Sequence, residues 1–237
     1  MPFTEETRAK FAAVSTATLT TVLLKRGFRN VFISDLKLIN PGAPRLVGPA
    51  YTLRYIPSRE DLDHPGVFED RGHPQRRAVE ECPPGHVLVI DSRKDHRAAS
   101  AGGILVARMY KRGVAGIVSD GGFRDSPDIA ELPFPVYHVA PAAPTNLIRH
   151  HAMDLNVPIG CGDVPVYPGD IVVGDGEGVV IVPGEIAEAV ADEAFEQTVF
   201  EDFVQEQVMG GRGIFGIYPP GPEAKAEFAA WRAARGR

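Results

Sequence analysis

The chain gathers its candidate chemistry in one stretch, Gly113-Val-Ala-Gly-Ile-Val-Ser-Asp-Gly-Gly-Phe-Arg-Asp-Ser-Pro-Asp128. The stretch opens with an apolar run over residues 114–118 and breaks at Gly121 and Gly122. An apolar run that stops at glycines is typical of a buried strand that ends in a turn. Because ligands of open α/β sheets bind beyond the carboxyl ends of the strands, this turn is a candidate site.

The charged residues of the turn suit two kinds of ligand. Arg124 offers a planar fork of donors for a carboxylate, and Asp125 offers oxygen ligands for a hard divalent cation. Asp120 and Asp128 flank the pair and could support it. The same charges could instead be solvated, or could form an ion pair that fixes the turn, and the local sequence leaves both interpretations open.

The stretch belongs to a βαβ unit. The pattern predicts a strand at residues 86–91, a helix at 102–112 and the next strand at 114–120. Gly102 and Gly103 begin this helix, and the lack of side chains there leaves backbone N–H groups able to bind an anion. Close packing of the helix on a strand would explain the same glycines. The loop that contains these two glycines matches neither the dinucleotide-binding fingerprint nor a Walker loop.

Around this unit the pattern alternates helices and strands, which indicates an α/β fold. A helix is expected at residues 4–26 and a long amphipathic helix at 185–208. An antiparallel pair is expected within residues 165–183, with its hairpin turn at 175–178. The other expected elements are a strand at 46–56, a helix at 75–81, a loop at 92–101, a strand at 133–139, an unassigned segment at 146–153 and a peripheral helix within 219–237.

Acidic residues and histidines alternate over residues 57–73. They are Asp61, Asp63, His64, Glu69, Asp70 and His73. These side chains could bind a metal, but their spacing matches no helical i, i+4 pair and no tetrahedral ligand pattern. A solvated loop, or a lid over a substrate, is the interpretation that the spacing favours.

Composition excludes several classes of protein. The chain has 237 residues, 44% of them hydrophobic and 24% charged, as in ordinary soluble proteins. A formal net charge of −6 argues against a general nucleic-acid binder. The two cysteines, Cys82 and Cys161, indicate a reducing compartment. No signal peptide and no apolar run of about 18 residues is seen, so we expect a cytoplasmic protein that does not enter a membrane.

The motif Gly113-x-x-Gly-Ile-Val-x-Asp-Gly-Gly-x-Arg-Asp125 resembles the RraA-like family, which includes the class II 4-hydroxy-4-methyl-2-oxoglutarate (4-carboxy-4-hydroxy-2-oxoadipate) aldolases. Segments 48–52, 168–175 and 178–183 follow in the family's order, so the resemblance covers about residues 10–218. It implies one compact, layered β/α domain of the swivelling type over residues 1–237, with a long C-terminal helix and a peripheral segment at 219–237. The long C-terminal segment is closest to the longer members of the family.

The resemblance also implies roles for particular residues. In the family's aldolases the residue that corresponds to Asp125 binds Mg²⁺ or Mn²⁺, largely through waters, and Arg124 corresponds to the residue that binds the pyruvyl part of a 2-oxo acid. The helix-start amides that take the substrate carboxylate correspond to Gly102, Gly103, Ile104 and Leu105. The family forms homotrimers or hexamers with sites between subunits. Glu201 is the best match for the acidic residue that approaches a neighbour's metal.

The implied activity is that of a metal-dependent class II pyruvate aldolase. Such an enzyme cleaves a 4-hydroxy-2-oxo acid into pyruvate and a second carbonyl compound, and it would decarboxylate oxaloacetate as a side activity because both reactions pass through the pyruvate enolate.

One position departs from the aldolase pattern. Gly103 stands where the aldolases have an acidic residue that handles a proton or positions water. Asp91, Asp95 or His96 could replace it from the same loop. Two alternatives stay open: a non-enzymatic regulator of an endoribonuclease, which is the role of the family's namesake, and a lyase acting on a 2-oxo acid derived from a sugar acid.

Overall fold

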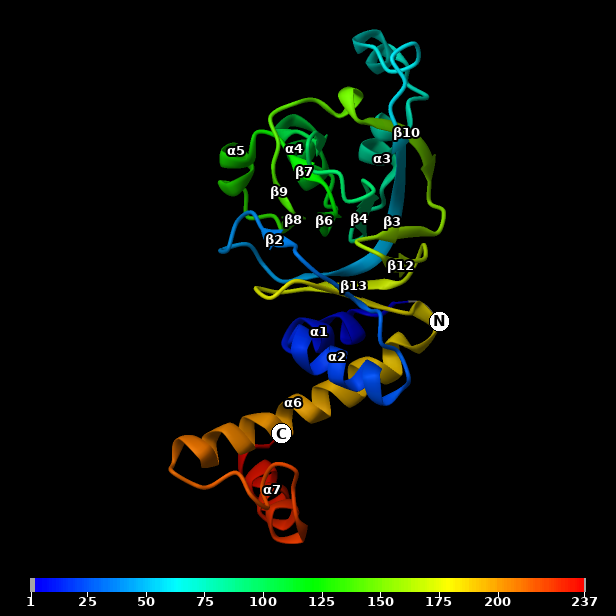
Figure 1. Cartoon of the computed structure of the whole chain (residues 1–237). Helices are drawn as coiled ribbons and strands as arrows, with labels where there is room; N and C mark the ends of the chain where they lie inside the picture. Colours follow the sequence, from blue (N-terminus) through cyan, green and yellow to red (C-terminus); the bar gives the residue numbers. More distant parts are fainter. Residues whose placement is uncertain (1–2, 237) are drawn as a thin grey trace.

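A long strand, β3 (Leu46–Pro57), connects the two halves of the fold. The computed structural model describes residues 3–236. The first half of β3 pairs with an antiparallel hairpin, while residues 50–54 also pair in parallel with β4 (Val87–Asp91). The strand can do this because its residues are buried along most of its length, with Leu46, Ala50 and Leu53 in the core. Figure 1 shows β3 running from the middle of the molecule to its upper end.

The parallel half carries the predicted βαβ unit. Strands β4, β6 (Gly116–Ser119) and β8 (Val136–His138) lie side by side in parallel, and helices α3 (Pro74–Glu81) and α4 (Gly103–Lys111) pack against them. The full order of the nine-stranded sheet is β1-β14-β13-β3-β4-β6-β8-β2, with β10 (His150–Leu155) added to β3. Its outer strands are β1 (Phe32–Ile33) and β2 (Lys37–Leu38).

The antiparallel half is the predicted hairpin. Strands β13 (Ile171–Gly174) and β14 (Val179–Val182) pair in register from Ile171 with Val182 to Gly174 with Val179. The turn between them closes with a hydrogen bond of 3.0 Å from the Asp175 amide to the Gly178 carbonyl oxygen. Gly178 has a backbone φ of 151°, which residues other than glycine rarely adopt.

Three clusters of buried apolar side chains form the core between the layers. One lies between the parallel strands and helices α3 and α4, and a second lies between the hairpin and helices α1, α2 and α6. The third lies inside the curled sheet, where residues of β3 and β4 meet residues of β13 and β14. This layered α/β arrangement confirms the expected fold class.

The predicted N-terminal helix at 4–26 is wrong as a single element. The structure has two helices, α1 (Glu5–Ala13) and α2 (Thr16–Lys25). Val14 is extended, with φ −104° and ψ 140°, and the Ser15 hydroxyl accepts a hydrogen bond of 3.0 Å from the Thr18 amide. A serine that caps a new helix competes with helix continuation, which explains the break.

Tertiary pairing creates elements that the local pattern did not predict. The expected loop at 92–101 contains β5 (Ala99–Ala101), which forms a small parallel sheet with β7 (Gly122–Phe123) and β9 (Ala140–Pro141). The unassigned segment at 146–153 is a 3₁₀ turn, η2 (Asn146–Ile148), followed by β10. The other elements are a strand pair β11 (Ile159–Cys161) and β12 (Val164–Val166), a short helix α5 (Ser126–Ala130) and the 3₁₀ turns η1 (Pro65–Glu69) and η3 (Gly184–Ile186).

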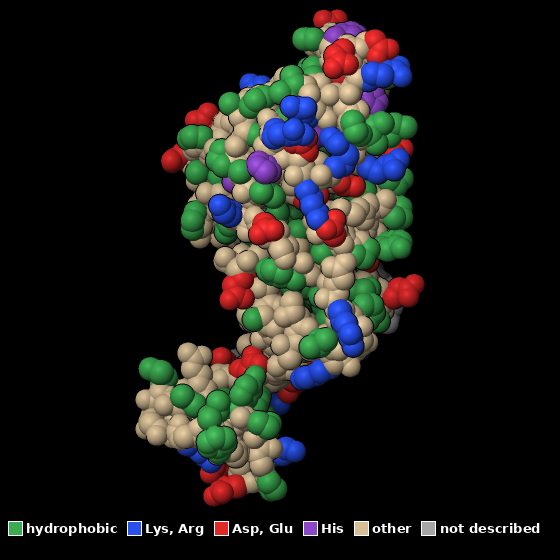
Figure 2. Space-filling model, viewed as in Figure 1, with side chains coloured by type: hydrophobic (Ala, Val, Ile, Leu, Met, Phe, Trp, Pro, Cys, Tyr) green, Lys and Arg blue, Asp and Glu red, His purple; other side chains and the backbone are tan. Residues whose placement is uncertain are grey.

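The C-terminal part forms an arm. Helix α6 (Ala187–Met209) packs against α1 and α2 through its first half, and its second half extends away from the body (Figure 1). Helix α7 (Pro222–Arg235) folds back on α6 through Phe203, Phe228 and Trp231. Figure 2 shows many apolar side chains on this arm. None of the helices within residues 3–236 is long and apolar enough to cross a membrane. The cytoplasmic location and the domain limits stay predictions.

Candidate active site

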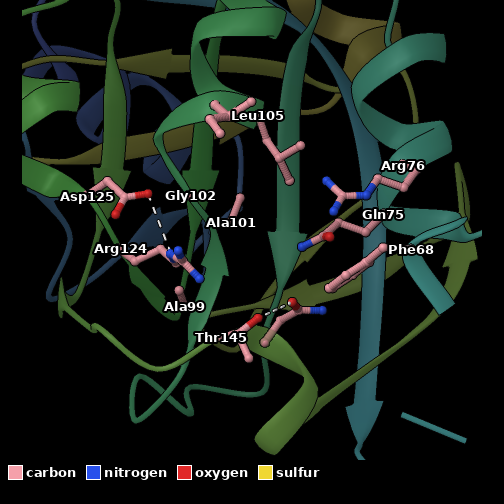
Figure 3. Close-up of a pocket in the computed structure, with 12 residues that line it drawn as sticks. Phe68, Gln75, Arg76, Ala99, Ala101, Gly102, Leu105, Arg124, Asp125 and Thr145 are labelled. Carbon is pink, nitrogen blue, oxygen red and sulfur yellow. Dashed lines mark hydrogen bonds and ion pairs between the residues drawn. The ribbon is translucent and has the colours of Figure 1, made fainter. Parts of the chain in front are cut away.

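A cavity of about 230 Å³ opens beside the predicted turn. Six segments meet there: the start of α4, strand β5, the loop between β7 and α5, the start of η2, the start of α3, and η1 (Figure 3). Its lining consists of Phe68, Gln75, Arg76, Ala99, Ala101, Gly102, Ile104, Leu105, Arg124, Asp125, Thr145 and Asn146. The structure therefore brings Arg124 and Asp125 together with three of the four predicted residues at the helix start.

Asp125 is held in an unusual conformation at this cavity. Its backbone is left-handed, with φ 58° and ψ 31°, which costs energy in a residue other than glycine and is concentrated at functional sites. Its Oδ2 accepts a hydrogen bond of 3.0 Å from the Gly103 amide and lies 3.5 Å from the Arg124 Nε. The Arg124 amide donates to the Ala101 carbonyl oxygen at 3.2 Å. The pair is thus fixed to β5 and to α4, yet both side chains remain accessible.

The glycines at the start of α4 make room for this pair. A Cβ on Gly102 would lie 3.0 Å from both Arg124 Cγ and Asp125 Oδ2, and a Cβ on Gly103 would lie 3.1 Å from Asp125 Cβ. An acidic side chain at position 103 would therefore crowd Asp125. The Gly103 amide already binds Asp125, so only part of the predicted anion site at Gly102, Gly103, Ile104 and Leu105 is open to a ligand.

Asp120 supports the site without lining the cavity. This carboxylate is buried and accepts hydrogen bonds from the amides of Ser92 at 2.6 Å, Lys94 at 3.1 Å and Gly162 at 3.0 Å. Burial raises the pKa of Asp120, and the backbone donors oppose that rise. Asp120 joins the loop after β4 to the turn after β6, and it faces a separate surface hollow.

Two other predicted residues lie elsewhere. Asp128 is exposed in the first turn of α5 and does not line the cavity. Glu201 lies on α6, where its Oε2 accepts a hydrogen bond of 2.9 Å from the Thr18 hydroxyl and its Oε1 accepts one of 2.8 Å from the Gln197 side-chain Nε2. Within one chain, Glu201 therefore joins α6 to α2.

The three substitutes considered for the missing acid do not reach the cavity. Asp95 pairs with Arg97, and these hydrogen bonds lower the pKa of Asp95. Asp91 accepts a hydrogen bond from the Arg93 amide, and burial raises the pKa of Asp91. Among the described lining residues, Asp125 is the one carboxylate.

Sequence reasoning missed the wall opposite Arg124. Gln75 and Arg76 lie in the first turn of helix α3, and Phe68 comes from the polar segment interpreted as a possible lid. The Gln75 side-chain amide donates to the Tyr55 hydroxyl at 3.0 Å and to the Ser100 carbonyl oxygen at 2.8 Å, which fixes α3 to the site. Nothing in the local sequence distinguishes Arg76 from the solvated Arg77, so only the lid interpretation pointed towards this wall.

The residues present suit a weakly held hard cation. Within residues 3–236 no three His, Cys, Asp or Glu side chains converge as a metal site, and this includes the acids and histidines of residues 57–73. Asp125 Oδ2 is engaged, whereas no described residue bonds its Oδ1. Mg²⁺ commonly keeps several waters and takes one or two carboxylates together with oxygens of the substrate. One accessible carboxylate beside an open cavity fits that pattern.

Comparison with known proteins identifies the family. The RraA-like model (Aldolase/RraA) matches residues 14–181, and the chain belongs to this family. A protein of Halalkalibacterium halodurans, provisionally named as a 4-hydroxy-4-methyl-2-oxoglutarate aldolase, is 34% identical over 63% of this chain and 65% of its own length. The chain therefore spans slightly less than two thirds of that relative.

Two further proteins show the range of names within the family. A 4-hydroxy-4-methyl-2-oxoglutarate aldolase of Thermus thermophilus is 30% identical over 60% of this chain and 78% of its own length. The crystal structure of Streptomyces coelicolor RraAS2, described as an unusual member of the RNase ES inhibitor RraA family, superposes with a TM-score of 0.74 at 31% identity. That match covers 85% of this chain and 96% of RraAS2.

The Asp120→Ala variant tests the role of the buried carboxylate. The substitution leaves three backbone N–H groups without their acceptor, so we expect the free energy of unfolding to fall by about 3 kcal/mol. Urea denaturation followed by circular dichroism measures this change. Asp128→Ala, which removes an exposed carboxylate nearby, is the control and should change stability by less than about 0.5 kcal/mol. If the two variants are equally stable, the hydrogen bonds from the three backbone N–H groups to Asp120 do not stabilise the fold.

The Gly102→Ala variant tests the fit between α4 and the Arg124–Asp125 pair. Its Cβ would press on both side chains, and displacements of this kind reduce catalysis strongly, so we expect at least a roughly 10-fold loss of activity in a folded protein. The assay is the release of pyruvate described below. Gly160→Ala is the matched control, because a Cβ at Gly160 would meet nothing within 4 Å. Full activity of Gly102→Ala would contradict this account of the site.

Proposed function

We propose that the protein is a class II pyruvate aldolase, which cleaves a 4-hydroxy-2-oxo acid into pyruvate and a second carbonyl compound. The observation that carries this proposal is the accessible Arg124–Asp125 pair, held at the start of α4 on the edge of a cavity. The family membership and the names of two relatives support the same class of reaction.

The reaction needs a stabilised enolate. The bond between C3 and C4 breaks, its electron pair forms the enolate of pyruvate, and the C4 hydroxyl loses its proton as the second carbonyl forms. When bound, Mg²⁺ or Mn²⁺ supplies a Lewis acid that polarises the 2-oxo group. Asp125 would hold that cation through its free Oδ1, and the Gly103 amide and Arg124 fix the position of this carboxylate.

Arg124 binds and stabilises the reacting end of the substrate. Its guanidinium lies in the cavity and has Asp125 as its charged neighbour, at 3.5 Å. A fixed positive charge beside the carboxylate and the developing enolate oxygen lowers the energy of the transition state. Ala99, Ala101 and Leu105 give the cavity apolar walls, which strengthen this interaction by limiting water.

Water carries out the two proton transfers of the proposed reaction. No histidine, no lysine and no carboxylate except Asp125 is found among the described residues that line the cavity. A Schiff base would need such a lysine, so the lining favours the enolate route. Water then accepts the C4 hydroxyl proton and returns one to C3 of the enolate. Oxaloacetate would lose CO₂ at the same site because that reaction gives the same enolate.

A regulatory function is the second candidate. Gly103 lacks the acidic side chain of the aldolase pattern, and the Streptomyces relative is described as a member of an RNase inhibitor family. The accessible Asp125 and Arg124 favour the enzyme, because a surface that binds a protein does not require a carboxylate held in a strained conformation beside a cavity. A lyase acting on a 2-oxo acid derived from a sugar acid would use the same residues.

Pyruvate release tests the proposed reaction. We expect pyruvate from 4-hydroxy-4-methyl-2-oxoglutarate and from oxaloacetate, in the presence of Mg²⁺ or Mn²⁺ and not after their removal with a chelator. Arg124→Gln and Asp125→Asn should each lower kcat/KM by about 100-fold or more, because each removes a charge at the reacting end. The measurement is a coupled lactate dehydrogenase assay.

Glu131→Gln serves as the control in this assay, since Glu131 is an exposed residue next to α5 that does not line the cavity. A folded wild-type protein that releases no pyruvate from either compound would contradict the proposed aldolase and would favour the regulatory function.

We also propose that the chain assembles as a homotrimer or hexamer through its C-terminal arm. Met209 at the end of α6 is 81% exposed, Phe215 in the segment that leads to α7 is 98% exposed, and Ile214 and Tyr218 of the same segment are about half exposed. Exposed apolar side chains concentrated in one segment are typical of an interaction surface.

Sedimentation velocity tests the assembly. The wild-type protein should sediment as a multiple of the 25.6 kDa chain, and Phe215→Ser should shift the distribution towards the monomer, because it removes apolar area from the contact. A wild-type protein that sediments as a monomer at every concentration would contradict the proposed assembly.

A further inference from the structure

Arg76 is a partly buried cation without an acidic partner. Most other arginines near the site form ion pairs, for example Arg77 with Glu81, Arg97 with Asp95 and Arg108 with Glu80. No carboxylate within residues 3–236 forms an ion pair with Arg76, and burial lowers the pKa of Arg76. A desolvated charge without a counter-charge is unfavourable unless something compensates for it. A bound anion would provide that compensation.

The guanidinium of Arg76 is prepared for a ligand. Its central carbon lies 4.3 Å from the centroid of the Phe68 ring. Stacking of this kind occupies the flat face of the guanidinium and leaves the N–H groups at its edge free for a carboxylate. Phe68 therefore holds Arg76 in place without using its donors.

Arg76 faces Arg124 across the cavity. Figure 3 shows the two guanidinium groups coming from opposite walls, with Arg76, Gln75 and Phe68 on one side and Arg124 and Asp125 on the other. Two separated cations in one cavity fit a ligand with two separated carboxylates. The cavity, at about 230 Å³, is large enough for a small dicarboxylic acid.

A buried amide supplies a further donor. Asn146 lines the cavity and is only 4% exposed, and its Nδ2 has no hydrogen-bond partner in the structure. Its Oδ1 accepts a hydrogen bond of 3.2 Å from the Thr145 hydroxyl, so the Nδ2 remains available. Buried donors are almost always paired in native proteins, and a ligand oxygen would satisfy this one.

We propose that Arg76, stacked on Phe68 and assisted by Asn146, forms a second carboxylate subsite, which selects a 2-oxo acid with a distal carboxylate. This inference rests on the proposed function for the placement of the reacting end at Arg124 and Asp125. The distal subsite itself rests on the geometry of the opposite wall. Arg76 is thus a specificity-determining residue: it binds the part of the substrate that does not react.

Ligand binding tests the subsite independently of catalysis. NMR titrations in the presence of Mg²⁺ would compare pyruvate, which has one carboxylate, with 2-oxoglutarate, which has the same reacting end and a second carboxylate. We expect Arg76→Gln to weaken the binding of 2-oxoglutarate by about 10- to 100-fold, the value of a lost charged hydrogen bond, and to leave that of pyruvate within about 2-fold. Arg124→Gln should weaken the binding of both.

Arg77→Gln is the matched control. It makes the same change one residue further along α3, at an arginine that pairs with Glu81 and does not line the cavity, and it should bind both ligands as the wild-type protein does. Arg76→Lys should recover part of the lost affinity for 2-oxoglutarate. Circular dichroism confirms that each variant is folded. If Arg76→Gln lowers the affinity for pyruvate and for 2-oxoglutarate equally, or lowers neither affinity, the proposed subsite is wrong.

Turnover separates this proposal from the proposed reaction. The wild-type protein should cleave 4-hydroxy-4-methyl-2-oxoglutarate with a higher kcat/KM than 4-hydroxy-4-methyl-2-oxopentanoate, which lacks the distal carboxylate, and Arg76→Gln should reduce this preference by about 10-fold or more. If Arg76 controls binding of 2-oxoglutarate but no substrate yields pyruvate, the subsite stands and the aldolase proposal fails. If pyruvate forms and Arg76→Gln keeps the preference, the aldolase stands and the subsite fails.

Discussion

The hydrogen bond from the Gly103 amide to Asp125 is the constraint on which the site depends. It joins the first residue of α4 to a carboxylate whose own backbone is left-handed, and the absence of side chains at positions 102 and 103 leaves room for the Arg124 and Asp125 side chains beside it. A carboxylate at a helix N-terminus is electrostatically favourable, which offsets part of the cost of that backbone conformation. The site therefore depends on two segments that fit each other: the start of α4 and the turn that contains Arg124 and Asp125.

The rest of the fold holds these segments in register. Strand β3 connects the hairpin to the parallel strands, β5 and β7 pair beneath the cavity, and Asp120 ties the loop after β4 to the turn after β6. The opposite wall comes from α3, which Gln75 anchors to Tyr55 and to Ser100. The cavity thus has one wall suited to a reaction and another suited to recognition, each fixed to the same sheet.

The sequence predicted the local parts of this design well. The strand and turn ending in Arg124 and Asp125, the hairpin at 171–182 and the long C-terminal helix follow from periodicity and glycine positions, which act over short distances. The predictions from the sequence failed where contacts between residues distant in the chain determine the secondary structure. The Ser15 cap divided a helix, and β5 exists only because β7 pairs with it. Arg76 could not be recognised because its lack of a carboxylate partner is a property of the folded chain.

A crystal structure of the protein with Mg²⁺ and 2-oxoglutarate would test the central claim most directly. The account predicts that the carboxylate and 2-oxo group at one end lie beside Asp125 and Arg124, and that the distal carboxylate lies on the edge of the Arg76 guanidinium within hydrogen-bond distance. A ligand bound away from this cavity, or bound in it with its distal carboxylate in solvent and Arg76 unengaged, would contradict the two-ended site.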